Sequence, residues 1–170
     1  PGQSWFAWSC LLGILLGQNG ENKSGFSSGT SELEIVDLGC GDGTLTVEMA
    51  KFATRVIGVD FNPDMLASAR QRIDRLGLQN VKLLAEDVGN LSLPAESLDV
   101  VFFSQSLHHL DNPQRGFQEA ARILRPGGKV LVMELATHSE EWVLEKLGHK
   151  WLGFEKETLQ DFMQTAGFRN

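Results

Sequence analysis

The sequence predicts a doubly wound α/β domain with a mostly parallel sheet, and two observations support this fold class. Short apolar runs alternate with amphipathic stretches at helical spacing between residues 33 and 135. Helix caps and turn residues separate these runs. Alternating strands and helices form a parallel sheet with right-handed crossovers and helices on both faces.

The strands and helices of this pattern follow one another with few gaps. Five apolar runs are expected to be strands, at residues 33–37, 55–60, 81–85, 98–103 and 129–135. The expected helices are at 44–53, 63–76, 113–124, 139–147 and 156–166. The second helix has the clearest punctuation, because Asn62 can cap it, Pro63 suits its first position and Gly77 can end it. The segment RPGG before the last strand is expected to form a turn.

The 170 residues fit one domain, and we expect four parts within it. Residues 1–17 contain an apolar run that Ser4 can cap and Gly17 can end, which favours a helix over a signal sequence. Residues 18–32 are rich in Gly, Ser and Asn and read as a flexible loop. Residues 33–135 form the core, and 136–170 form C-terminal helices.

Composition limits the classes of partner. A net charge of −7 argues against a nucleic-acid partner or an anionic membrane surface. The apolar run at residues 5–16 is too short to span a bilayer. The two cysteines, Cys10 and Cys40, match no metal-binding spacing, so we expect no metal and a reduced, cytoplasmic setting.

The carboxyl ends of the strands locate the candidate site. In open parallel sheets, ligands bind at these ends, near the switch in strand order. The residues that follow the first four strands are 39–43, 60–61, 87–88 and 104–109. We therefore expect all four segments to line one crevice.

The chemistry of these segments suits an adenosine. The glycines are spaced G-x-G-x-G, which differs from the G-x-G-x-x-G of dinucleotide binders, and no basic residue lies in the loop to hold a pyrophosphate. Asp60 can accept hydrogen bonds from ribose hydroxyls, or it can cap the next helix. Phe61 offers a flat surface to a purine. Asp87 and the Val88 N–H can read the adenine edge, although Asp87 can also be a solvated loop acid.

Five motifs together carry a resemblance to a known family. VDLGCGDG, VIGVD, AEDV, LDVVFFSQSLHHL and ILRPGGKVLVME resemble, in order and spacing, the motifs of class I S-adenosylmethionine-dependent methyltransferases. The resemblance implies a Rossmann-like sheet with strand order 3-2-1-4-5. It also implies S-adenosyl-L-methionine as cofactor and a methyl acceptor, which we expect to be a small molecule.

The same resemblance implies roles for individual residues. The positions it places around the cofactor are Asp37, Gly39, Cys40, Gly41, Asp60, Phe61, Asp87, Val88, Ser104 and Leu107. His108 and His109 are the candidate catalytic residues beside the reactive methyl group, and we expect one of them to pack and not to act as a base. His138, Glu141 and His149 form a second polar group, for which surface and helix-cap roles are favoured over contact with a substrate or a metal.

A narrower resemblance concerns both ends of the chain. PGQSW, THSEEWVLEKLGHKWLGF and LQDFMQTAGF resemble methyltransferase domains that follow an ArsR-type winged-helix regulator. The loop 18–32 is longer than that resemblance implies, and the chain ends where strands six and seven would follow. Expected partners therefore include a fused or separate regulator. Two alternatives stay open: a non-catalytic sensor of the cofactor or its demethylated product, and a dehydrogenase that binds NAD.

Overall fold

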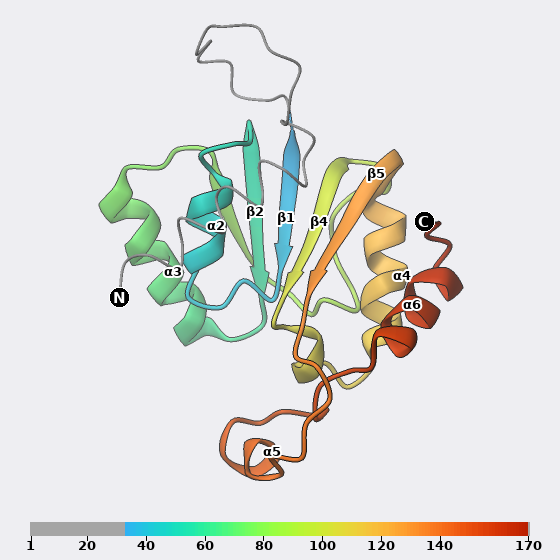
Figure 1. Cartoon of the computed structure of the whole chain (residues 1–170). Helices are drawn as coiled ribbons and strands as arrows, with labels where there is room; N and C mark the ends of the chain where they lie inside the picture. The colour runs from blue at the N-terminus through green and yellow to red at the C-terminus, as the bar shows by residue number, and fades with distance from the viewer. Residues whose placement is uncertain (1–32, 170) are drawn as a thin grey trace, which may run out of the picture.

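The computed structural model describes residues 33–169 and confirms the doubly wound parallel sheet (Figure 1). All neighbouring strands are parallel, and their order is β3-β2-β1-β4-β5, as predicted. The strands are β1 (Glu34–Leu38), β2 (Arg55–Asp60), β3 (Val81–Ala85), β4 (Leu98–Ser104) and β5 (Leu124–Met133). The helix expected at 1–17 and the loop expected at 18–32 lie outside the described residues.

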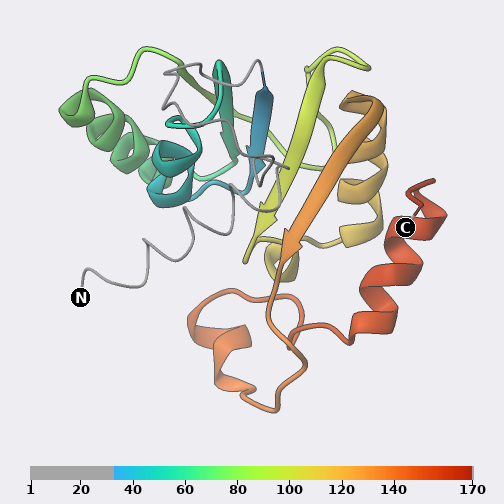
Figure 2. The ribbon, with the colours of Figure 1, turned by 45° about the horizontal axis from the view of Figure 1, so that its top comes forward.

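Helices cover both faces of the sheet. They are α2 (Thr44–Met49), α3 (Pro63–Leu76), α4 (Pro113–Ile123), α5 (Trp142–Lys146) and α6 (Lys156–Thr165), with a short 3-10 helix, η1 (Leu107–His109). Figures 1 and 2 show α2 beside α3 on one side and α4 beside α6 on the other. The η1 turn and α5 lie near the carboxyl ends of the strands, where the candidate site is expected.

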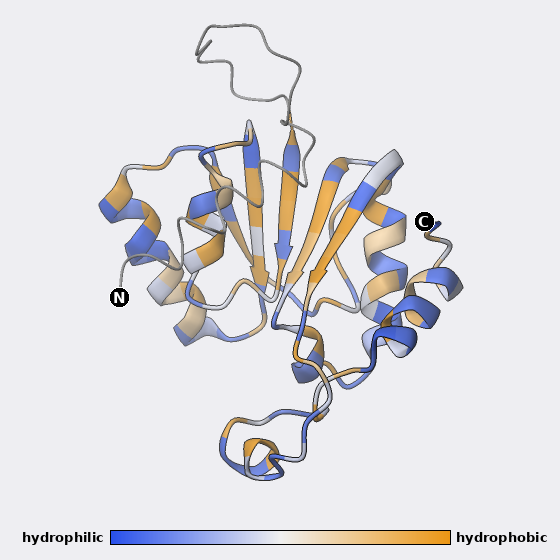
Figure 3. Ribbon diagram, in the orientation of Figure 1, coloured by the Kyte–Doolittle hydropathy of each residue, from blue (hydrophilic) through white to orange (hydrophobic). Residues whose placement is uncertain are grey.

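The core lies on both faces of the central strands. Ile35 of β1 packs with Leu45 and Met49 of α2, whereas Val36 packs in the opposite cluster with Phe117 of α4. Successive side chains of a strand point to opposite faces, so a strand that is covered on both faces is apolar throughout. In Figure 3 the central strands are mainly hydrophobic in colour, and hydrophilic residues interrupt them mostly near their ends. Burial on both faces fixes the register of the strands, and therefore the positions of their carboxyl ends.

The start of α3 is organised as its sequence predicted. The Oδ1 atom of Asn62 accepts hydrogen bonds from the backbone N–H groups of Asp64 (2.9 Å) and Met65 (3.4 Å). Pro63 occupies the first helical position, and Gly77 ends the helix in the left-handed conformation. These caps hold the turn between β2 and α3, which carries Asp60 and Phe61, in a fixed place.

Several expected boundaries differ from the structure, and α5 spans only Trp142–Lys146 of the helix expected at 139–147. The helix predicted at 44–53 ends at Met49, and Nδ2 of Asn80 donates to the carbonyls of Ala50 (2.8 Å) and Ala53 (3.0 Å) in the turn that follows. The strand predicted at 129–135 begins at Leu124, so RPGG lies within β5 and not in a separate turn. Its register against β4 shifts there, because four residues form an irregular segment between the two paired positions.

The chain after β5 returns to the site and then to α4. An isolated parallel bridge joins Ala136 to Phe154 on either side of α5, and α6 then packs on α4. Within residues 33–169, β5 is an edge strand without an antiparallel pair beside it. Among these same residues, no helix is long and apolar enough to cross a membrane.

Candidate active site

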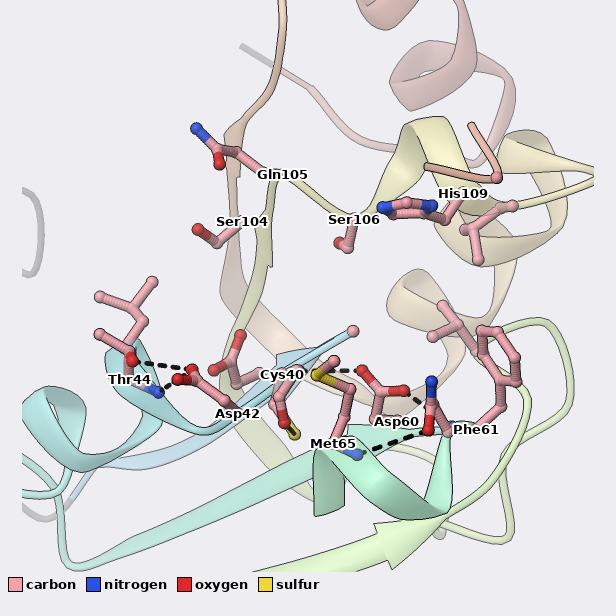
Figure 4. A pocket seen from close by; sticks show the side chains of 18 of the residues that line it. Cys40, Asp42, Thr44, Asp60, Phe61, Met65, Ser104, Gln105, Ser106 and His109 are labelled. Carbon is pink, nitrogen blue, oxygen red and sulfur yellow. Dashed lines mark hydrogen bonds between the residues drawn. The ribbon is translucent and has the colours of Figure 1, made fainter. Parts of the chain in front are cut away.

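A cavity of about 550 Å³ lies at the carboxyl ends of β1, β2 and β4. Its volume is within the range of small-molecule sites in proteins. Figure 4 shows the glycine loop and the end of β2 on one side, and Ser104, Gln105, Ser106 and His109 on the other. The residues of the predicted set that line it are Asp37, Gly39, Cys40, Gly41, Asp60, Phe61, Val88, Ser104 and His109.

The glycine loop passes so close to Ser106 that position 39 has no room for a side chain. The backbone N–H groups of Gly39 and Cys40 both donate to the Val59 carbonyl, at 2.8 and 2.9 Å, which folds the loop over the end of β2. Gly39 has a φ of +77°, and a Cβ there would lie 2.3 Å from Cβ of Ser106. Gly41 has a φ of +54°, but a Cβ there would meet no atom within 4 Å. Gly39 is therefore required by packing, whereas Gly41 leaves space open at the cavity wall.

Asp37 places a buried carboxyl group at the cavity. Its Oδ2 atom accepts a 2.6 Å hydrogen bond from Oγ1 of Thr46, and its Oδ1 atom is buried with no hydrogen-bond partner among the described residues. Burial raises the pKa of Asp37 to about 6, although the Thr46 hydrogen bond opposes the shift. A buried oxygen without a partner is costly, so this atom is suited to accept a hydrogen bond from a ligand.

Asp60 joins the two loops that form the lower wall of the cavity in Figure 4. Its Oδ2 accepts from the Gly41 N–H and its Oδ1 from the Asn62 N–H, both at 2.8 Å. The cap of α3 is supplied by Asn62, so the helix-cap alternative for Asp60 is wrong. Phe61, beside it, is 71% exposed although it lines the cavity. Each oxygen of Asp60 keeps a second lone pair, since a carboxylate has about four acceptor sites.

Asp87 and Leu107 lie away from the cavity. Asp87 does not line it, and its Oδ1 accepts a 2.8 Å hydrogen bond from the Gly89 N–H. Its neighbour Val88 lines the cavity and is almost fully buried. The Leu107 side chain is fully buried in the core, and its backbone N–H donates to Glu134. The cavity therefore gives no support to the predicted cofactor roles of Asp87 and Leu107.

The segment after β4 separates the two candidate catalytic histidines. Gln105 has a φ of +51°, which is a strained conformation for a side chain of its size and redirects the chain into η1. His109 lines the cavity, but His108 is 3% exposed and lies behind it. We expected one of the two histidines to pack inside the protein, and His108 does so.

Glu134 holds His108 in place and is not among the site residues predicted from the sequence. Its Oε1 atom lies 2.6 Å from Nδ1 of His108 and accepts from the backbone N–H of Leu135 (2.7 Å), and its Oε2 atom accepts from the backbone N–H of Leu107 (2.8 Å). Burial alone would raise the pKa of Glu134, but these hydrogen bonds outweigh burial and hold it below its usual value. Glu134 directly follows β5, which ends at Met133 and not at 135 as predicted, so the strand-end rule finds Glu134 only with the observed bounds.

His149 lies beside His108 and His109, and not with His138 as was expected from the sequence. Its ring centroid lies 4.2 Å from that of His108 and 4.8 Å from that of His109. His138 instead accepts a 3.2 Å hydrogen bond from the Glu140 N–H through Nδ1. Burial, and then the neighbouring His108, lower the pKa values of both His109 and His149. Both rings are therefore neutral at pH 7.

The family is decided by a match across the strands that build this cavity. The family model described as "Methyltransferase domain" matches residues 36–132, more than half of the chain. The chain belongs to the methyltransferase domain family. The match runs from β1 to β5, so it covers the glycine loop, Asp60 and η1. It favours a methyltransferase over the dehydrogenase alternative.

The curated relatives of this methyltransferase domain are longer proteins. It is 35% identical over 104 residues to a demethylmenaquinone methyltransferase of Corynebacterium kroppenstedtii, covering 61% of this chain and 42% of the relative. It is 30% identical over 141 residues to a 2-methyl-6-phytyl-1,4-hydroquinone methyltransferase of rice, Oryza sativa, covering 81% of this chain and 42% of the relative. The chain thus spans about two fifths of the length of the curated relatives that it matches.

Solved structures share the fold of the methyltransferase domain. The YcgJ protein from Bacillus subtilis superposes with a TM-score of 0.78 at 19% identity, covering 94% of this chain and 68% of that one. A methyltransferase from Aquifex aeolicus that is described as SAM-dependent superposes with a TM-score of 0.70 at 21% identity, covering 83% and 75%. At these identities the likeness shows the fold.

Proposed function

We propose that this domain binds S-adenosyl-L-methionine and transfers its methyl group to a small-molecule acceptor. The observation that carries the proposal is the cavity at the carboxyl ends of the strands, whose wall contains an Asp37 Oδ1 atom with no hydrogen-bond partner within residues 33–169. The neighbours described as SAM-dependent methyltransferases, such as the one from Aquifex aeolicus, support the choice of cofactor.

The residues of the cavity fit such a ligand. Asp37 presents a buried acceptor oxygen, and Gly41 leaves room beside it for the amino-acid tail. Asp60 keeps lone pairs for ribose hydroxyls, and Phe61 offers its exposed ring to the adenine. The loop has no basic residue for a pyrophosphate, which disfavours a dinucleotide in this cavity.

The reaction itself asks little of the protein beyond position and exclusion of water. The cofactor, when bound, supplies a methyl group on a sulfonium centre that a nucleophile can attack in line. The chain's contribution is to orient the acceptor, and His109 is the candidate catalytic side chain that lines the cavity. Its neutral ring can accept a proton from an acceptor that carries an O–H, N–H or S–H group. His108, behind it, positions η1 through Glu134.

Hydroquinones are the first acceptors to test. Two relatives carry names that refer to quinone-type substrates, a demethylmenaquinone and a phytyl hydroquinone. A phenolic O–H on an apolar ring suits a cavity that has both polar and apolar walls. Other phenols, thiols, amines and arsenite complete the screen, although two separate cysteines provide no thiolate trio for arsenite.

Calorimetric titration with S-adenosyl-L-homocysteine tests the proposal directly. Binding is expected for the wild type and for Asp74→Asn, an exposed acid on α3, and weaker binding for Asp60→Asn. Absence of binding up to millimolar ligand would refute the proposal. The alternative of a non-catalytic sensor, whose link to an ArsR-type regulator stays a prediction, shares the cavity. It is favoured only if the ligand binds and no acceptor in the screen is methylated.

A further inference from the structure

Three histidines from distant parts of the sequence converge beside the cavity. One ring nitrogen from each of His108, His109 and His149 lies within 4.8 Å of the nitrogens of the other two. His108 and His109 are consecutive in η1, whereas His149 follows α5 forty residues later in the chain. We infer that these three side chains form a binding site for a zinc-class divalent metal ion at the edge of the cavity.

The backbone holds the two contributing segments together. The His108 carbonyl accepts from the N–H groups of Lys150 (2.7 Å) and Trp151 (3.3 Å). The indole N–H of Trp151 also donates to the Leu110 carbonyl at 2.8 Å. His149 is therefore fixed beside η1 by its own neighbours, and the convergence of the rings does not depend on the imidazoles themselves.

Glu134 gives His108 the orientation that a metal ligand needs. Nδ1 of His108 faces Oε1 of Glu134 at 2.6 Å, which leaves Nε2 as the ring nitrogen for a metal ion. A carboxylate behind a metal-binding histidine is a common arrangement, because it fixes the tautomer and the ring orientation. The His108 and Glu134 side chains are 4% and 1% exposed, so solvent does not compete for this hydrogen bond.

The other two rings also suit a metal ion. Nδ1 of His149 is buried with no hydrogen-bond partner among the described residues, which is a cost that coordination would remove. The His109 ring packs against the other two, with centroids 4.3 Å from that of His108 and 4.8 Å from that of His149. Zinc bonded to nitrogens at 2.0–2.1 Å in tetrahedral geometry separates them by about 3.4 Å, so the rings would close by about an ångström on binding.

Three imidazoles and no thiolate select the type of ion. Imidazole nitrogens suit zinc, cobalt, nickel and copper, whereas magnesium and calcium require oxygen ligands. Three protein ligands also leave one tetrahedral position open, as in catalytic zinc sites. His109 and Gly148 line the cavity, so an acceptor with a thiol, phenol or carboxylate would complete the coordination. This role for the acceptor as fourth ligand rests on the proposed function.

The metal site and the general-base role of His109 exclude each other. Coordination uses the lone pair that a base would need to accept a proton. A metal titration therefore distinguishes the two roles without any measurement of methyl transfer. It also separates the failure of this inference from the failure of the proposed function, because binding of S-adenosyl-L-homocysteine is measured independently in the same samples.

The test is calorimetry with zinc on the chelator-treated chain. One equivalent should bind, and cobalt should give the visible absorption of a four-coordinate site. Loss of a hydrogen-bond partner behind a metal ligand typically lowers metal affinity roughly 10- to 100-fold. Glu134→Gln should therefore weaken zinc binding by roughly 10-fold, and His149→Ala, which removes a ligand itself, by at least roughly 10- to 100-fold. His138→Ala is the matched control and should bind as the wild type does.

Two outcomes would overturn the inference. The first is no zinc binding to the wild type at up to about 100 micromolar zinc, which excludes a site whose Kd lies well below that concentration. The second is equal affinity in the wild type and His149→Ala, which would place the ion elsewhere. Circular dichroism must show that His149→Ala is folded, and His109→Ala is the second variant if it is not. Loss of binding in either folded variant supports the site.

Discussion

Nδ1 of His108 lies 2.6 Å from Oε1 of Glu134, and this buried pair links η1 to the end of β5. The same carboxylate accepts the backbone N–H groups of Leu107 and Leu135. One side chain thus fixes the turn that carries His109 into the cavity. The geometry of the candidate site depends on this contact more than on any other beyond the glycine loop.

Glu134→Ala should therefore destabilise the domain strongly. It removes the acceptor of Nδ1 of His108 and of three backbone N–H groups, and each buried donor that is left unsatisfied costs about 1–3 kcal/mol. Glu134→Gln keeps one carbonyl oxygen and should cost about 1–3 kcal/mol. Urea unfolding measures both, with the exposed Glu141→Gln as control. A loss of stability in Glu134→Ala no larger than in the control would contradict the assigned hydrogen bonds.

The glycine loop offers a matched pair of substitutions. Gly39→Ala and Gly41→Ala both place a side chain in the left-handed region, which costs about 1–2 kcal/mol. Only Gly39→Ala also brings a Cβ within 2.3 Å of Ser106, so it should lose more stability in thermal or urea unfolding. Gly41→Ala should instead weaken binding of S-adenosyl-L-homocysteine, because its methyl group occupies space at the cavity wall.

A second substitution tests the reason for this difference. In a Ser106→Gly background the steric contact is absent, so Gly39→Ala should then cost no more than Gly41→Ala does. If the extra cost of Gly39→Ala persists in that background, the contact with Ser106 is not its cause.

Local signals in the sequence predicted much of this fold. Asn62, Pro63 and Gly77 act at short range, and the structure places all three in their expected positions around α3. The parallel order followed from the alternation of strands and helices. The start of β5 was missed, because the pairing of Leu124 with Leu98 is a long-range contact that RPGG, as a local turn signal, does not reveal.

The site was predictable only where it follows a strand end. Asp37, Asp60 and Val88 lie at strand ends and line the cavity as expected. His149 was assigned to His138 by closeness in sequence, yet backbone hydrogen bonds that cross from Lys150 to His108 bring it to η1. Such tertiary pairing leaves no periodic pattern for a sequence argument to detect.

Phe61 should contribute to ligand binding and not to stability. Its side chain is 71% exposed, so Phe61→Ala removes little buried area. Stacking of a base on an aromatic ring is worth about 1–3 kcal/mol, which corresponds to a roughly 5- to 150-fold loss of S-adenosyl-L-homocysteine affinity. Leu76→Ala, an exposed apolar residue at the far end of α3, is the control. Unchanged affinity in Phe61→Ala would remove this residue from the adenine site.

Asp37 should give the domain an unusual dependence of stability on pH. Burial raises its pKa from an ordinary 3.8 to about 6, so the folded state binds a proton more tightly than the unfolded chain does. The stabilisation from this proton is fully present below about pH 4 and is lost as the pH rises through 6. A shift of this size corresponds to about 3 kcal/mol.

Asp37→Asn isolates this effect from the other carboxylates. Hydrogen bonds lower the pKa values of Asp42, Asp99 and Glu119, whose contributions run in the opposite direction and are common to both proteins. The free energy of unfolding of Asp37→Asn, relative to the wild type, should therefore rise between pH 4 and pH 7, and level off above. The variant keeps an oxygen for Thr46 and should also bind S-adenosyl-L-homocysteine more weakly at pH 7.5. A difference in stability that does not change across this window would show that Asp37 is not buried as a carboxyl group with a raised pKa.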